Sequence, residues 1–139
     1  RTSSNRGSYR YLLQMEGGAG AVVAQMGSWL PSLQVQRDYC DALHSMARYA
    51  AQAVVDAGGA AAVVVAMRRH IADVQLQRDG LNALDSMSAG SDARKQAVVE
   101  AGGAAAVVVA MRRHIADVQL QRDGLNALDS MSAGSDARK

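Results

Sequence analysis

The chain has 139 residues, of which 49% are hydrophobic and 20% are charged, a balance that predicts a folded domain with a core and excludes a disordered chain. Its formal net charge of +2 at pH 7 is too small to indicate nucleic acid or to exclude it, and its one cysteine excludes an internal disulfide. No apolar stretch has the length of a transmembrane helix, so we expect an intracellular and most simply a cytoplasmic protein. Targeting to an organelle by a segment upstream of Arg1 stays open, because residues 1–10 are rich in Ser and Arg and lack acids, as transit peptides do.

An internal repeat organises the chain. Residues 57–95 return letter for letter as residues 101–139, so matching positions are 44 residues apart. The preceding residues also match, with Asp56 replaced by Glu100. This defines two nearly identical units, residues 52–95 and 96–139.

A third, diverged copy comes before these two units. Its segment LQVQRDYCDALHSM (33–46) lies over VQLQRDGLNALDSM (74–87) at an offset of 41 residues. We therefore predict a first unit over residues 1–51 and three units in all, which is about the number that a stacked array needs to bury its faces. We also expect the three units to be a segment of a longer array, since stacked arrays carry polar capping units.

Local signals in chain order predict three helices in a complete unit. In the first unit Pro31 stands where the third helix would begin, as Pro often does at the first helical position. In the second unit AAAVVVAMRRH (60–70) predicts the second helix, which ends in Arg68, Arg69 and His70, where the helix dipole favours cations.

The third helix of the later units begins near Asp73 or Asp117, each a plausible N-cap, and runs through VQLQRDGLNALDSM to Ser-Ala-Gly. The first helix of the third unit, ARKQAVVEA, follows an N-cap at Ser91 or Asp92 and ends at the pair Gly102-Gly103.

The valine triplet in the second helix could also be read as a strand. That alternative is disfavoured because no alternating partner strand and no hairpin signal accompany it, so its backbone would lack hydrogen bonds. On a helix, Val63, Val64 and Met67 share one apolar face with Ala60, and Val65 points away from it. We predict that burial of this face outweighs the weak helix propensity of valine.

Three helices per unit of 40-odd residues, with KQAVVEAGGAAAVVVAM followed by VQLQ and LNALDSMSAGSD, resemble the armadillo repeat. The resemblance covers the chain from about residue 9 to its end and implies an all-α fold, a right-handed α-solenoid of about three armadillo-like repeats. HEAT-like arrays are the alternative, although their units usually have two helices. The family implies a concave groove lined by the third helices, which binds extended peptides in some members.

Peptide-binding members carry a Trp and, one turn later, an Asn on the third helix. These positions fall on Asn82 and Ser86 in the second unit, and neither residue matches. The corresponding pairs in the other units do not match either: Asp41 and Ser45, and Asn126 and Ser130. The departure argues against binding of nuclear localisation signals.

Spacing alone predicts a polar column on one face of the third helices. Its members are Arg37, Asp41 and Ser45, then Arg78, Asn82 and Ser86, then Arg122, Asn126 and Ser130. The column could form hydrogen bonds to an acidic or extended partner, because Arg binds carboxylates in a forked geometry. The alternative is a solvated face on which Arg78 pairs locally with Asp79 or Asp85.

Other kinds of site are disfavoured. The MRRH clusters carry no interleaved aromatic residues for base stacking, so nucleic acid is an unfavoured partner. His70 and His114 have no further ligand at metal-binding spacing, and Cys40 replaces Leu81, which indicates a core residue. We expect no catalytic residues, no cofactor and no metal, since near-identical units create a periodic surface instead of one asymmetric active site.

Val65 and Val109 occupy a second-helix position that is commonly charged and outward-facing in armadillo units, and Ala24 is their counterpart in the first unit. These residues predict a mildly apolar stripe on the convex side, although single exposed valines are common. We expect a non-catalytic protein-interaction scaffold within a larger complex. The alternatives are a peptide-cargo adaptor that uses the groove, and a basic binder of nucleic acid or membrane surfaces.

Overall fold

The computed structural model describes the backbone of residues 18–137 and the side chains of residues 18–132. Within this range the chain is all-helical and has no strand, which confirms the predicted all-α class. The helices are α2 (Ala19–Ser28), α3 (Leu33–Asp56), α4 (Gly59–Arg69), α5 (Val74–Ser88), α6 (Asp92–Glu100), α7 (Gly103–Arg113) and α8 (Val118–Ala137).

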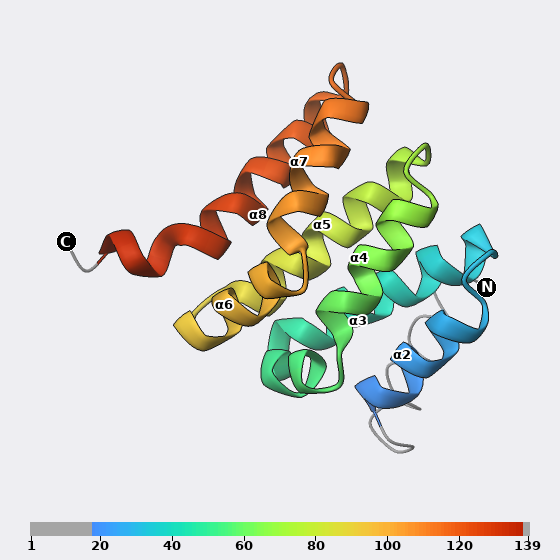
Figure 1. The fold of residues 1–139 in the computed structure, drawn as a ribbon, viewed down its shortest axis with the longest axis horizontal. Helices are drawn as coiled ribbons and strands as arrows, with labels where there is room; N and C mark the ends of the chain where they lie inside the picture. The colour runs from blue at the N-terminus through green and yellow to red at the C-terminus, as the bar shows by residue number, and fades with distance from the viewer. Residues whose placement is uncertain (1–17, 138–139) are drawn as a thin grey trace.

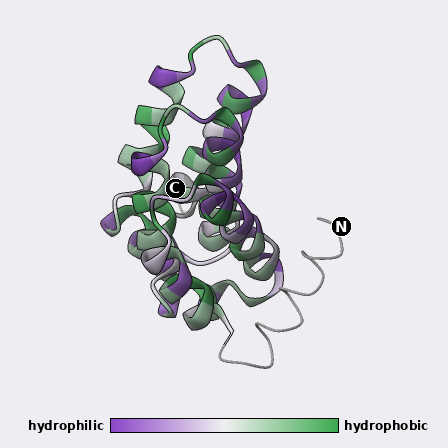
Figure 2. Ribbon diagram, turned by 90° about the vertical axis from the view of Figure 1, so that its right-hand side faces the viewer, coloured by the Kyte–Doolittle hydropathy of each residue, from purple (hydrophilic) through white to green (hydrophobic). Residues whose placement is uncertain are grey.

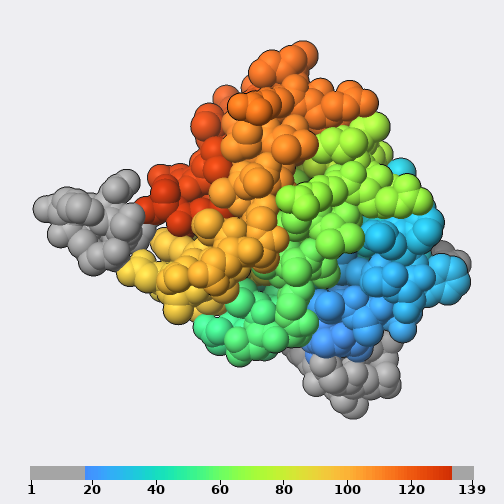
Figure 3. Space-filling model, in the orientation of Figure 1, coloured from blue at the N-terminus to red at the C-terminus, as the bar shows by residue number. Residues whose placement is uncertain are grey.

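Most of these helices form two layers (Figure 1). The short helices α2, α4 and α7 lie side by side in chain order, and we call them the short-helix layer. The longer helices α3, α5 and α8 also pack in chain order, and we call them the long-helix layer. The space-filling view shows the same progression across the surface, from α2 to α8 (Figure 3).

The core lies between the two layers. The second helix of the middle unit contributes Val63, Val64 and Met67, which are at most 3% exposed, and α5 contributes fully buried Leu84 and Met87. The helices are amphipathic, with hydrophobic and hydrophilic residues on the same helix (Figure 2). The predicted apolar face of the valine triplet is confirmed, because burial of these β-branched side chains compensates for their low helix propensity.

Side-chain caps begin several of the helices at the predicted residues. Asp73 accepts a hydrogen bond from the backbone N–H of Leu76 at 2.7 Å, and Asp117 does the same for Leu120 at 2.9 Å. Of the two candidates before α6, Ser91 is the N-cap, and it accepts from the N–H of Arg94. These caps satisfy N–H groups that have no partner inside the helix.

Pro31 does not take the predicted first position of a helix. The N-cap of α3 is Ser32, whose hydroxyl accepts a hydrogen bond from the N–H of Val35, so Pro31 precedes the helix by two residues. The serine side chain offers a capping oxygen, and the proline is accommodated in the turn before it.

The long helix α3 contains a break in the segment where the first unit is three residues shorter than the later units, a length difference that predicts a connection between units. Ala50 has φ −139° and ψ 45°, which is not helical, so α3 consists of two helices that meet at an angle. The break lies two residues before the start of the predicted second unit, and the short segment after it corresponds in sequence to α6.

The pairs of glycines turn the chain into the short-helix layer. Gly58 and Gly102 have φ values of 89° and 96°, in the left-handed region that favours glycine. A Cβ added at the next residue, Gly103, would lie 2.8 Å from the carbonyl oxygen of Val98. Each pair therefore combines a left-handed turn with a close approach of two helices.

The end of the last helix differs from the prediction. In the middle unit α5 ends at Ser88, before Gly90 with φ 87°. The identical sequence in the third unit stays helical to Ala137, so the predicted stop at Ser-Ala-Gly is wrong there. In the middle unit Arg94 of the following α6 donates to the carbonyl oxygens of Met87 and Ala89, which stabilises the turn.

Candidate functional site

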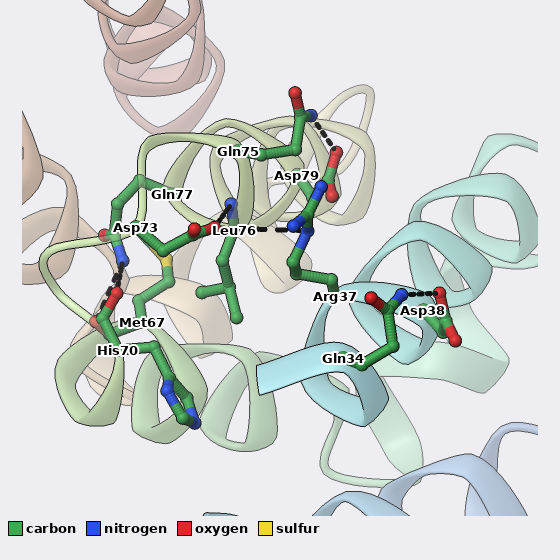
Figure 4. A network of polar contacts seen from close by, with 10 residues as sticks. All are labelled: Gln34, Arg37, Asp38, Met67, His70, Asp73, Gln75, Leu76, Gln77 and Asp79. Carbon is green, nitrogen blue, oxygen red and sulfur yellow. Dashed lines mark hydrogen bonds and ion pairs between the residues drawn. The ribbon is translucent and has the colours of Figure 1, made fainter. Parts of the chain in front are cut away.

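The polar column predicted from spacing lies on the long-helix layer, where two of its three arginines form ion pairs with the following unit. The Nε of Arg78 on α5 forms an ion pair with Oδ2 of Asp123 on α8 at 3.0 Å. Arg37 on α3 lies 4.0 Å from Oδ2 of Asp73, before α5 (Figure 4). The expected local pairing of Arg78 is wrong, because its side chain reaches the neighbouring helix and meets a carboxylate that is only 9% exposed.

The serines of the column also contact neighbouring helices. Nδ1 of His44 on α3 lies 3.1 Å from Oγ of Ser86 and 3.2 Å from the carbonyl oxygen of Asn82, both on α5. One helix pair further along, the hydroxyl of Ser130 on α8 donates to the carboxylate of Asp85. In both cases the serine of one unit contacts the preceding unit at the same repeat position, which is His44 in the first unit and Asp85 in the second.

Four of the nine side chains of the column are left for a ligand. Within the described residues, the side-chain amides of Asn82 and Asn126, the hydroxyl of Ser45 and the guanidinium of Arg122 have no hydrogen-bond partner. Asn82 is half-buried, whereas Asn126 and Arg122 are exposed. The structure therefore assigns much of the column to contacts between units.

The histidines at the ends of the second helices have a structural role that sequence reasoning missed. Nε2 of His70 contacts the carbonyl oxygen of Leu30 at 2.8 Å, and Nε2 of His114 contacts that of Ile71 at 2.7 Å. Each histidine thus binds the loop of the preceding unit. The only signal in the sequence is their recurrence at one position. No cluster of three metal-ligating side chains occurs in the part of the chain that the structure describes.

A glutamine connects the two layers within each unit, and it is buried in the first two units. Nε2 of Gln77 donates to the carbonyl oxygens of Met67 and His70, each at 3.0 Å (Figure 4). Gln36 and Gln121 make the same pair of bonds in their own units. These bonds satisfy carbonyl groups at the end of the second helix, where no intrahelical donor remains.

The short-helix layer exposes the two valines that the sequence placed on the outward side. Val65 on α4 is 48% exposed and Val109 on α7 is 47% exposed. A hollow of about 240 Å³ lies beside Val65 between α2 and α4. Its lining includes Gly27, which stands where the next unit has Arg68. The sequence could have indicated this hollow through Gly27, because a glycine in place of the arginine leaves space at the surface.

Cys40 is fully buried in α3, as expected for a residue that replaces a core leucine. Burial raises the pKa of its thiol, and the charges of Asp79 and Asp41 raise it further. The thiolate is the reactive form of cysteine, so this side chain is unsuited to nucleophilic chemistry in the folded protein.

Comparison with known proteins does not assign the chain to a family. No protein-family model matches the chain, and no curated protein sequence matches it. Among the described helices, none alone has both the length and the apolar composition of a membrane span. The pair α3 and α4 meets those two criteria jointly, with a bend of 101° between them.

Proposed function

We propose that this chain is a non-catalytic protein-interaction scaffold, a right-handed solenoid of armadillo-like units that forms part of a larger assembly. The internal repeats support the proposal, because near-identical units present the same side chains at regular intervals. A periodic surface of this kind suits recognition of an extended partner, as in other solenoid proteins.

The observation that carries the proposal is the matched exposure of Val65 and Val109 on the short-helix layer. The two side chains lie on neighbouring helices and are exposed to 48% and 47%. The apolar hollow beside Val65 continues this surface toward α2. We propose that a protein partner covers this surface and places an apolar side chain in the hollow.

A concave groove along the long-helix layer, as the armadillo resemblance implies, is the alternative site. A peptide-cargo adaptor would use the polar column to bind the backbone of its cargo. Arg78 and Ser130 are not available for this purpose, because they pair with Asp123 and Asp85. The side-chain amides of Asn82 and Asn126 would then have to make most of the contacts with the cargo. We therefore favour the valine surface.

The test compares two double variants of the full chain, each expressed with a tag in its native cell. We expect Val65→Asp with Val109→Asp to lose the native complex, because a charge opposes burial of an apolar surface. We expect Asn82→Ala with Asn126→Ala to retain it. The complex is measured by size-exclusion chromatography and crosslinking mass spectrometry of the purified assembly.

Circular dichroism melting serves as the folding control, since all four side chains are at least partly exposed and their replacement should preserve the fold. Retention of the complex by the valine variant together with its loss in the asparagine variant would contradict the proposal. That result would identify the groove as the binding site.

A further inference from the structure

A hollow of about 570 Å³ opens beside the break in α3. One wall is the stretch of α3 around the break, and the other is the turn from α5 to α6, which lies beside it (Figure 1). The lining includes Arg48, Tyr49 and Ala51 on the first wall and Ser86 and Arg94 on the second. Both walls lie well inside the described range, and the volume is that of a site that holds a ligand.

The hollow exists because two alanines stand where the next unit has long cationic side chains. Arg94 and Lys95 reach back and donate hydrogen bonds to carbonyl oxygens of the turn before α6. Their counterparts in the preceding unit are Ala50 and Ala51, whose methyl groups are too short to do so. The first unit is also three residues shorter here, so the chain makes a break instead of a turn.

The hollow carries positive charge. Arg48 and Arg94 both line it, and its lining contains no carboxylate. Arg48 is exposed and has no ion pair or hydrogen bond among the described residues. Arg94 donates to the carbonyl oxygens of Met87 and Ala89 at 2.9 and 2.7 Å, and no carboxylate within the described range pairs with it. A cleft lined by charges of one sign attracts the opposite charge, so this hollow favours an anion.

The other polar side chains of the lining are engaged within the protein. The hydroxyl of Ser86 contacts His44, and the amide of Gln52 donates to Asp56. The donors that remain therefore belong chiefly to the two arginines. Five alanines and the half-exposed Tyr49 complete the lining and give it an apolar part.

We propose that this hollow binds an acidic side chain of a protein segment, whose carboxylate is held by Arg48 and Arg94. A guanidinium offers two parallel donors that match the two oxygens of a carboxylate. The alanine methyl groups and the ring of Tyr49 provide contacts for the carbon atoms of the acidic residue and its neighbours, which an inorganic anion would leave unused. The hollow is a second binding site, independent of the partner proposed for Val65 and Val109 on the short-helix layer.

The experiment titrates the full 139-residue chain with capped pentapeptides and follows its NMR spectrum up to millimolar peptide concentrations. One pool of peptides has Glu at the centre with varied flanking residues, and the control pool has Gln there. The signals of Arg48, Tyr49 and Ala51 can be identified because their stretch of sequence is not repeated. We expect the Glu pool to shift these signals in a saturable way, and the Gln pool to bind about tenfold more weakly or less.

Two variants locate the site. Arg48→Ala should weaken binding of the Glu pool about fivefold or more, since it removes one of the two cations. The matched control is Arg69→Ala, which removes the same charge from an exposed arginine outside the hollow and should bind as the wild type does. Circular dichroism melting shows whether each variant is folded.

Ala51→Lys separates binding in the hollow from attraction to a positive surface. This substitution introduces the residue of the next unit, Lys95, so it fills the hollow while it adds a positive charge. We expect it to weaken binding of the Glu pool about fivefold or more. Tighter binding by this variant would overturn the proposal, because it would show that charge alone attracts the peptides.

The wild-type titrations decide the proposal even without the variants. It is overturned if the Glu pool leaves the signals around the hollow unshifted, or if the Gln pool binds equally well. Inorganic phosphate is titrated in parallel. Shifts at the hollow with phosphate but not with the Glu pool would also overturn it, and would identify a site for a free anion.

Discussion

Arg78 and Asp123 lie 45 positions apart in the sequence, and their side chains form an ion pair of 3.0 Å between α5 and α8. Asp123 is an almost buried carboxylate that also accepts a hydrogen bond from Gln119. The pair joins two units of identical sequence, so one unit supplies the cation and the next supplies the anion.

Removal of this carboxylate should destabilise the fold. In Asp123→Ala, Arg78 loses its ionic partner while it stays partly buried, and we expect the free energy of unfolding to fall by about 1–3 kcal/mol. Urea unfolding followed by circular dichroism measures the change. Glu100→Ala is the control, because Glu100 is exposed and should change stability by less than about 0.5 kcal/mol. Equal effects of the two variants would show that the ion pair does not contribute.

The buried glutamine of the middle unit should contribute in a similar range. Gln77→Ala removes both hydrogen bonds to the end of α4 and leaves the carbonyl oxygens of Met67 and His70 without these donors. We expect a loss of about 1–3 kcal/mol in the free energy of unfolding. The control is Gln75→Ala, since Gln75 is exposed and bonds only to Asp79. A stability of Gln77→Ala equal to that of this control would refute the role of the buried bonds.

Two glycine-to-alanine substitutions should act in opposite directions. At Gly103 the added methyl group would lie 2.8 Å from the backbone oxygen of Val98, so we expect destabilisation of about 1–3 kcal/mol. At Gly27, inside α2, nothing lies within 4 Å, so alanine should stabilise the helix by about 0.5–1 kcal/mol. Thermal unfolding of both variants tests the pair. A Gly103→Ala variant at least as stable as the wild type would contradict the packing described for the Gly102-Gly103 turn.

Stability should decline in alkaline solution because of Cys40. The folded state raises the pKa of the thiol, so above the ordinary thiol pKa of about 8.5 the unfolded chain loses a proton that the folded chain keeps. The folded state then binds more protons, and the free energy of unfolding falls by up to about 1.4 kcal/mol per pH unit. Below that pKa the term is constant.

The measurement is urea unfolding at several pH values between neutral and alkaline, for the wild type and for Cys40→Ala. The variant has no thiol to titrate, so its stability should fall less steeply in alkaline solution. A thiol reagent should also label Cys40 slowly in the folded chain and rapidly after unfolding. Parallel pH profiles of the two proteins would disprove the contribution of the thiol.

The helices of this chain could be predicted from the sequence because capping residues and hydrophobic spacing are local signals. Asp73, Asp117 and Ser91 cap the helices they were expected to cap, and the valine triplet is helical with Val65 outward. The caps depend on residues within about one helical turn, and the outward position of Val65 follows from the helical period, so the sequence alone determined them. The valine triplet is helical because its apolar face is buried. The chemistry of the polar column was also predictable as a set of residue types on one helix face.

Tertiary structure alone decided what those residues contact. Leu81 and Leu125 lie in identical stretches of sequence, and one is buried while the other is exposed. Arg78 was expected to pair within its own helix, but its partner lies on the next helix of the layer. The physical reason is that burial and ion pairing depend on which surfaces meet, and a repeated sequence carries the same local signals wherever it lies in the chain.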